Sequence, residues 1–217
     1  MKILIHVARV LVGTLFIFSG LIKANDPLGL AYKMEEFFDV WRFHLLDNFT
    51  LFFSIAMIVF EIAAGVAILL GWKMKIFSWL LLLLIVFFSF LTGYAFLSGK
   101  IHECGCFGNC IPLSAGESFA KDLALLILIV LLFFVQDRIR PVFSSLINVT
   151  VLVLVVVFSF SLQWYVLRQL PIVDCLPYHV GVNIIEKMKP PPGAIPDSTV
   201  ISFVYEKNGR QVEFTAD

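Results

Sequence analysis

Charged residues are scarce in this sequence. Only 15% of the 217 residues are Asp, Glu, Lys or Arg, whereas 60% are hydrophobic and 23 are phenylalanines. A soluble domain has about a quarter charged residues and about half apolar ones, so this composition indicates a protein surrounded by lipid. The formal net charge is zero, so nothing indicates nucleic-acid binding. We therefore expect membrane lipids as partners and no nucleic acid.

Features of two other protein classes are missing. Met1-Lys2 precedes an apolar run as in a signal peptide, but Arg9 interrupts the run and several more apolar segments follow, which favours a membrane anchor. Clear internal repeats and broken helices are also missing, which disfavours a small-molecule carrier.

Five apolar segments are candidates for crossing a membrane as helices. They run over about residues 3–22, 51–71, 77–97, 123–135 and 142–165. The fourth is short, near the low end of what can cross. The predicted fold class is an all-α integral membrane protein with a four-helix transmembrane bundle, a fifth transmembrane helix and a tail. The corresponding domains are residues 1–140, 141–166 and 167–217.

Helix-start signals refine this plan. Asp26 is a predicted N-cap and Pro27 suits the first helical position, so an amphipathic helix is expected at about 27–46, lying in the interface. Ser114 and Glu117 fit a capping box, so the fourth membrane helix begins before its apolar part.

The tail after Arg168 differs in character. Its prolines predict an extended chain. Asn208-Gly209 between two strand-like runs, 199–206 and 210–215, predicts a β-hairpin. Because an isolated hairpin is marginally stable in water, we expect this chain to be a truncated piece or the hairpin to dock on something else.

Basic residues in short connections predict the orientation in the membrane. With the N-terminus inside, five of them fall in short cytoplasmic segments: Lys2, Lys73, Lys75, Arg138 and Arg140. The expected location is a bacterial inner membrane, crossed several times, with the N-terminus cytoplasmic and the C-terminus periplasmic. All four cysteines then face the oxidising periplasm, where disulfides persist.

Three of those cysteines lie within seven residues: Cys104, Cys106 and Cys110. A disulfide between Cys104 and Cys106 would close a very small, strained ring and would be easily reduced, so these two are the candidate catalytic residues. The nearby helix N-terminus and a protonated His102 could favour a thiolate. Cys110 and Cys175 are the candidates for a resolving or structural disulfide.

Two other readings of the cysteines stay open, because four cysteines allow three complete pairings. In one, Cys110 and Cys175 form a plain structural disulfide that pins the tail to the loop. In the other, Cys104, Cys106, Cys110 and His102 bind a soft metal such as zinc or copper, although their spacing is not a standard finger spacing.

Ionisable residues within the apolar segments form a second set of candidates, because an unpaired charge at lipid depth is costly. We predict a pair between Arg9 and Glu61, which His6 joins, as an intramembrane polar network. An outer polar cluster is predicted near the cysteine loop, comprising Lys23, Asp26, Lys121, Asp122 and His102. Alternatively, these residues only satisfy one another or extend to the interface. The Arg9–Glu61 pair could be a structural lock or serve a proton or quinone site.

Several of these residues together resemble a known family. The pattern resembles the MauE branch of the DoxX-like membrane proteins, over about residues 1–140, and consists of Arg9, Phe18-Ser19-Gly20 with Lys23, Glu61, Cys104-Gly105-Cys106-Phe107-Gly108 and Lys121-Asp122. The fifth span and the tail resemble Bacteroidetes-type DoxX proteins. The extra Cys110 and the tail depart from a minimal MauE pattern.

The resemblance implies a DoxX-like four-helix bundle. It links MauE members to methylamine utilisation, where they help to mature a disulfide-rich dehydrogenase subunit. It links other DoxX-like proteins to quinone and thiol metabolism.

Two functional hypotheses follow. In the first, the protein is a thiol–disulfide oxidoreductase whose Cys104 and Cys106 exchange electrons with a periplasmic thiol-containing protein or thioredoxin-like domain, with a quinone as the candidate cofactor. In the second, it is a non-catalytic assembly protein whose cysteines only staple the outer loop to the tail.

Overall fold

A computed structural model of the protein describes most of the chain. The described residues are 2–42, 44–98, 113–173, 201–207 and 210–216, with Gly108, Cys110, Cys175, Gly181, Asn183, Ile185 and Met188. They fall into two compact units, Met1–Leu176 and Pro177–Asp217.

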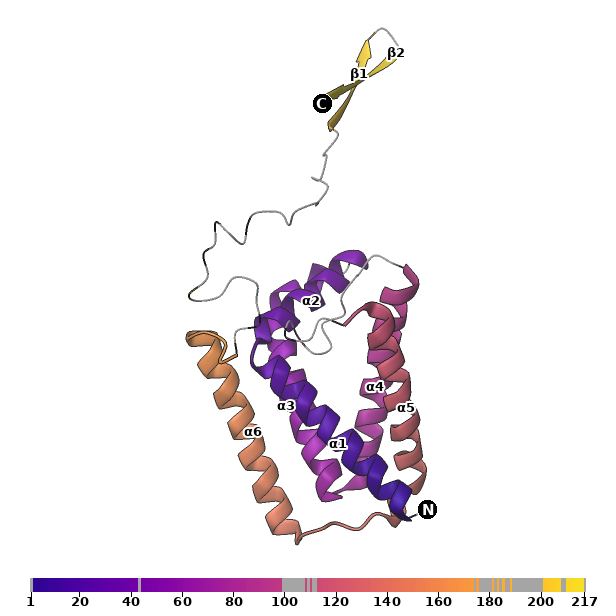
Figure 1. Ribbon diagram of the computed structural model, residues 1–217, viewed down its shortest axis with the longest axis vertical. Coiled ribbons are helices and arrows are strands. Elements are labelled where there is room, and N and C mark those ends of the chain that lie inside the picture. Colours follow the sequence, from indigo (N-terminus) through magenta and orange to yellow (C-terminus); the bar gives the residue numbers. More distant parts are fainter. Residues whose placement is uncertain are drawn as a thin grey trace. The chain divides into compact units, whose positions relative to one another are not determined.

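The first unit is helical (Figure 1). Its helices are α1 Lys2–Ala24, α2 Pro27–Val40, α3 Thr50–Leu70, α4 Met74–Ser98, α5 Ala115–Val135 and α6 Ser145–Arg168. Two 3-10 turns, η1 His44–Phe49 and η2 Gln136–Arg138, extend α3 and α5. Among the described residues, five helices are long and apolar enough to cross a membrane: α1, α3 with η1, α4, α5 with η2, and α6. The predicted fold class is therefore confirmed.

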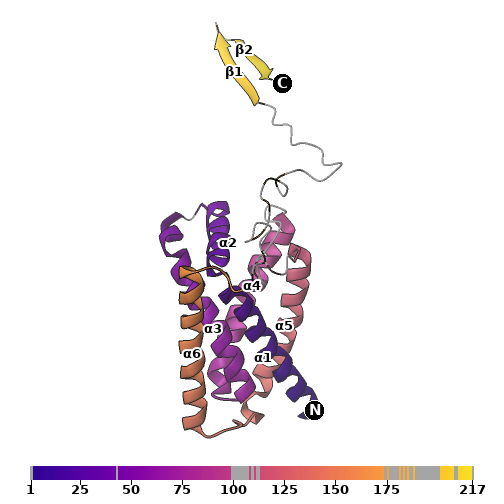
Figure 2. The ribbon, with the colours of Figure 1, turned by 60° about the vertical axis from the view of Figure 1, so that its left-hand side comes forward.

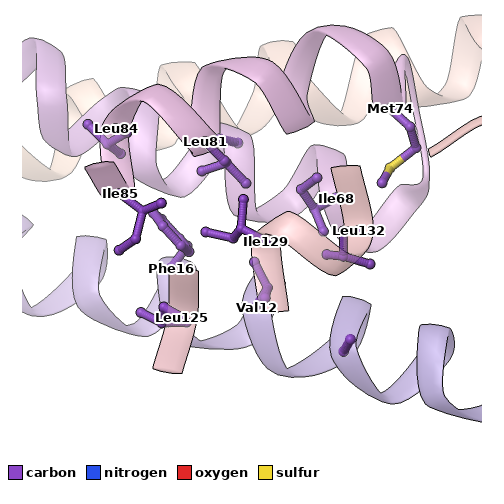
Figure 3. Packing of buried hydrophobic residues seen from close by; sticks show 12 residues of the cluster. Val12, Phe16, Ile68, Met74, Leu81, Leu84, Ile85, Leu125, Ile129 and Leu132 are labelled. Atoms are coloured by element: carbon purple, nitrogen blue, oxygen red, sulfur yellow. The ribbon is translucent and has the colours of Figure 1, made fainter. Parts of the chain in front are cut away.

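The long helices form a bundle of two close pairs (Figures 1 and 2). α1 packs along α3, α4 packs along α5, and α1 also contacts α5. α6 lies against α3, while α2 packs on α3 at one end of the bundle. The core between α1, α3, α4 and α5 is apolar (Figure 3) and includes Val12, Phe16, Ile68, Leu81, Ile85, Leu125 and Ile129.

Glycines allow α1 and α3 to approach closely. A Cβ atom placed on Gly65 would lie 2.8 Å from the carbonyl oxygen of Gly13, and one on Gly13 would lie 2.9 Å from that of Gly65. Further along, a Cβ on Gly20 would lie 2.5 Å from a side-chain carbon of Ile62. Small residues at a membrane helix interface permit this backbone contact, which gives the pair much of its packing energy. The antiparallel register sets which polar side chains of the two helices meet.

The outer surface of the bundle is apolar. Leu97 and Phe134, on α4 and α5, are 85% and 80% exposed. Large apolar side chains exposed on every long helix are unfavourable in water, so they support the assignment of the first unit to a bilayer.

The helix starts follow the predicted signals. Asp26 caps α2 by accepting a hydrogen bond from the Gly29 N–H at 2.9 Å, and Pro27 is the first residue of the helix. Ser114 and Glu117 form the capping box of α5. α4 begins at Met74, three residues earlier than expected, because Gly71 in a left-handed conformation ends α3 in a tight turn.

The second unit contains a two-stranded antiparallel hairpin. β1 Ile201–Lys207 pairs with β2 Arg210–Ala216, and Lys207 is opposite Arg210. The predicted hairpin with a two-residue loop is confirmed; the loop itself, Asn208-Gly209, lies outside the described residues.

Candidate functional site

A buried ion pair joins the two helices that pack most closely. The Lys23 ammonium lies 2.6 Å from the Glu61 carboxylate, and the side chains are only 3% and 2% exposed. Ser19, one turn before Lys23 on α1, donates a weak hydrogen bond of 3.4 Å to the other oxygen of Glu61. The ammonium also lies 4.9 Å from the centre of the Phe88 ring, a cation–π distance. The pair is therefore enclosed by three helices.

A second carboxylate is buried nearby on α5. Asp122 is 1% exposed and accepts a hydrogen bond of 3.1 Å from the Thr92 hydroxyl on α4. Its other oxygen is 2.8 Å from the ammonium of Lys121, which is partly exposed. Both carboxylates thus have a lysine and a hydroxyl as partners.

The two ion pairs line one small cavity. Its volume is about 30 Å³, and its walls include Lys23, Glu61, Lys121, Asp122 and Ser19. A volume of this size has room for about two water molecules. We call these five residues the buried charge cluster. It places two carboxylates and two ammonium groups around a space in which protons could be exchanged, inside a largely apolar helical bundle.

The covalent link between loop and tail lies at the end of α1 that carries this cluster. Cys110 and Cys175 form a disulfide with Cα atoms 4.7 Å apart. Asn25 holds the tail as well, because its amide donates to the Val173 carbonyl at 2.8 Å and accepts from the Val173 N–H at 3.0 Å.

Gly108 of the loop packs on the end of α1. A Cβ atom on this glycine would be 3.5 Å from the Ile22 side chain. Ile22 directly precedes Lys23, so this part of the loop adjoins the helix that carries the buried ammonium.

The predicted pair between Arg9 and Glu61 is wrong. The Arg9 guanidinium lies beside Gly71, as shown by the distance of 3.2 Å between Nη1 and a Cβ atom placed on that glycine. Gly71 is ten residues after Glu61, which is about 15 Å along α3 at 1.5 Å per residue. Side chains on a helix lean toward its N-terminus. Arg9 therefore extends away from Glu61, whereas Lys23 reaches back to it. His6 is exposed and does not join the pair.

The predicted outer cluster is found in part. Lys23, Lys121 and Asp122 come together, but around Glu61 inside the bundle. Asp26 is instead the N-cap of α2. His102, Cys104 and Cys106 lie outside the described residues, so the Cys-x-Cys site and the metal alternative stay predictions.

Sequence reasoning missed two hydroxyl partners, Ser19 and Thr92. Ser19 could have been found, because it precedes Lys23 by four residues and therefore shares its helix face. Thr92 gave no comparable signal, since a threonine inside an apolar helix commonly bonds to its own backbone.

These features define a class of protein: a multi-pass helical membrane protein with buried ion pairs between its helices and a disulfide that joins a loop to its tail. A family model described as "Methylamine utilisation protein MauE" matches residues 1–135. The chain therefore belongs to the MauE family. The matched region contains α1 to α5 and the whole buried charge cluster.

A curated protein is also similar to the chain. Protein TlpB of Flavobacterium psychrophilum is 30% identical over 136 residues, which cover 61% of this chain and 37% of TlpB. The chain thus spans well under half of that relative's length. No solved structure matches the chain.

Proposed function

We propose that this protein is a membrane thiol–disulfide protein whose Cys104 and Cys106 exchange electrons with the cysteines of a periplasmic partner protein. Membership of the MauE family supports a role in redox or disulfide handling at a membrane. The observation that carries the proposal is the Cys110–Cys175 disulfide, which joins the same cysteine-rich loop to the tail. With Cys110 engaged, Cys104 and Cys106 are the remaining pair.

The proposed exchange is balanced. A thiolate of the partner attacks the Cys104–Cys106 disulfide and forms a mixed disulfide between the two proteins. The partner's second thiol then attacks this mixed disulfide and releases the cysteine of this protein as a thiol. The partner gains a disulfide and loses two electrons, while Cys104 and Cys106 become thiols and take up two protons. The reverse reaction reduces the partner. The buried charge cluster serves as the proton reservoir for this cycle, and a quinone is the candidate electron carrier.

The orientation belongs to the same proposal: a bacterial inner membrane, with the N-terminus cytoplasmic and the tail periplasmic. Support comes from the basic turns. Lys75 lies 3.0 Å from Asp137, so the α3–α4 turn and the end of α5 occupy the same end of the bundle. Their lysines and arginines are thus gathered on one side, as the positive-inside rule expects for cytoplasmic loops. The DoxX-like relationship is likewise proposed, supported by the four-helix arrangement of α1, α3, α4 and α5.

The test compares two double variants in the purified 217-residue chain. Cys104→Ser/Cys106→Ser should abolish oxidation of a reduced dithiol peptide, whereas Cys110→Ser/Cys175→Ser should retain it. Thiol trapping with mass spectrometry should show a readily reduced bond between Cys104 and Cys106. Unchanged oxidation in the first variant would refute the proposal.

A second candidate is a non-catalytic assembly protein. It is favoured by the two holds on the tail, the Cys110–Cys175 disulfide and the hydrogen bonds of Asn25. Under this candidate, Cys104 and Cys106 are inert in the same assay, and only loss of the Cys110–Cys175 bond impairs binding of the partner.

A further inference from the structure

A large apolar cavity lies between α2, α3 and α4. Its volume is about 520 Å³, within the range of about 300–1,000 Å³ that is usual for small-molecule sites. Its walls are aromatic and aliphatic, and include Phe37, Phe38, Trp41, Phe53, Phe60 and Phe87. Trp41, Phe53 and Phe87 are each partly exposed, so the cavity opens onto the surrounding lipid. A ligand dissolved in the bilayer can therefore enter it sideways.

The cavity adjoins the buried charge cluster. Phe88 lines both cavities, and its ring is the one that Lys23 contacts. Thr92 also lines the apolar cavity and donates its hydroxyl to Asp122. A molecule in the apolar cavity is thus separated from the charge cluster by one phenylalanine ring and one threonine.

The lining restricts the chemistry of the occupant. Lys33 is the single charged residue among the described residues that line the cavity, and its ammonium lies 2.9 Å from Glu36. A phospholipid head group would require many polar partners, which these walls do not offer. A flat ring with carbonyl groups needs few donors and stacks on aromatic side chains. Its carbonyl oxygen can accept a hydrogen bond from Lys33.

We propose that this cavity binds a bilayer-soluble quinone. The quinone ring lies beneath α2 near Lys33 and Trp41, and the apolar side chain of the quinone leaves between α3 and α4. Binding of the quinone is independent of the proposed thiol exchange, and only the use of the quinone as an electron carrier rests on it. In that use, the Cys104 and Cys106 thiols form an S–S bond and lose two electrons and two protons. The quinone takes up the two electrons and two protons and becomes a quinol.

Binding is tested by fluorescence, because quinones quench tryptophan and Trp41 lines the cavity. One variant of the whole 217-residue chain retains only Trp41, with phenylalanine at Trp72, Trp79 and Trp164. Its matched control retains only Trp79, which lies on the lipid-facing side of α4, 60% exposed. Titration with a decyl-substituted benzoquinone in lipid nanodiscs should quench Trp41 saturably and Trp79 only in proportion to the quinone in the bilayer. Equal, unsaturated quenching of both would overturn the proposal.

A cavity-filling variant sharpens the test. Ala56 lines the cavity, whereas Ala63, two helical turns further along α3, is absent from its lining. Ala56→Phe should weaken saturable quenching of Trp41 by about tenfold or more, and Ala63→Phe should leave it unchanged when its helix content by circular dichroism matches that of the parent. Lys33→Met should weaken binding less. Unchanged binding in Ala56→Phe would place the ligand elsewhere.

A lipid occupant is the main competing outcome. A phospholipid with brominated acyl chains also quenches tryptophan, so it is titrated in the same way. If it quenches Trp41 saturably and the benzoquinone does not displace it, the cavity holds an acyl chain and the proposal is wrong. Because these measurements need no thiol chemistry, they can succeed or fail independently of the dithiol-peptide assay.

Discussion

Replacing Lys23 and Glu61 singly and together tests whether their contributions to the free energy of unfolding are coupled. At 2.6 Å and an effective dielectric constant of about 20, the Coulomb attraction is about 6 kcal/mol. The desolvation cost of both ions opposes this attraction. Lys23→Met leaves a buried carboxylate with the weak Ser19 hydroxyl beside it, and Glu61→Leu leaves a buried ammonium beside Phe88. Each single change should lower the free energy of unfolding by about 3–5 kcal/mol.

The double variant Lys23→Met/Glu61→Leu leaves no unpaired charge in the pair. It should be more stable than either single variant and close to the parent, because apolar replacements of a buried ion pair are often neutral or stabilising. The measurement is loss of helical circular dichroism in mixed micelles of mild and denaturing detergents. Lys75→Met is the control, since its pair with Asp137 is exposed and contributes at most about 1 kcal/mol. A double variant whose loss equals the sum of the single losses would refute the coupling.

Three further predictions concern packing and the tail. Gly65→Val should prevent close packing of α1 on α3, because its side chain would overlap the Gly13 backbone, and should lower the detergent-unfolding stability by at least about 2 kcal/mol. Asn25→Ala should leave the segment at Val173 held near α1 under oxidising conditions but open it to protease after reduction, because among the described contacts of that segment the disulfide is the one that remains once the Asn25 amide is gone. Ser114→Ala removes the cap of α5 and should cost about 1 kcal/mol in the same unfolding assay.

Each of these three predictions has a control variant or an outcome that would contradict it. Gly116→Ala should be mild, because its Cβ would be 3.2 Å from a movable Phe96 ring atom rather than from backbone. A stable Gly65→Val protein would show that the close approach is not required. Equal tail cleavage in Asn25→Ala and the parent after reduction would show that the amide contributes nothing. Ser114→Asp should retain the cap, so a loss equal to that of alanine would assign the effect to something else.

The fold could be predicted from the sequence because its signals are local. Apolar runs of sufficient length, the Asp26 cap and the Ser114–Glu117 box each specify an element without knowledge of the others. The Asn208-Gly209 turn does the same for the hairpin. Boundaries shifted by a few residues where a turn such as the one at Gly71 decides where a helix ends.

The site could be predicted only in part because its contacts join different helices. Glu61 was identified as a costly intramembrane charge, but its partner depends on the register of α1 against α3, which Gly13, Gly20 and Gly65 set. Depth counted in residues also ignores the lean of side chains toward the helix N-terminus, and this lean directs Lys23, not Arg9, to Glu61. Thr92 could not be identified without the packing of α4 on α5.

The disulfide between Cys110 and Cys175 has a consequence for how the protein is made. The two cysteines are 65 residues apart, and the intervening chain contains both α5 and α6. Each of these helices crosses the bilayer once in the proposed topology, so the sulfurs lie on opposite sides of the membrane whenever only one of the two crossings is complete. A nascent chain in which only one of the two helices inserts leaves Cys110 without access to Cys175. Closure of this covalent ring, visible as a mobility shift on a non-reducing gel, therefore excludes a chain in which only one of the last two helices has been inserted.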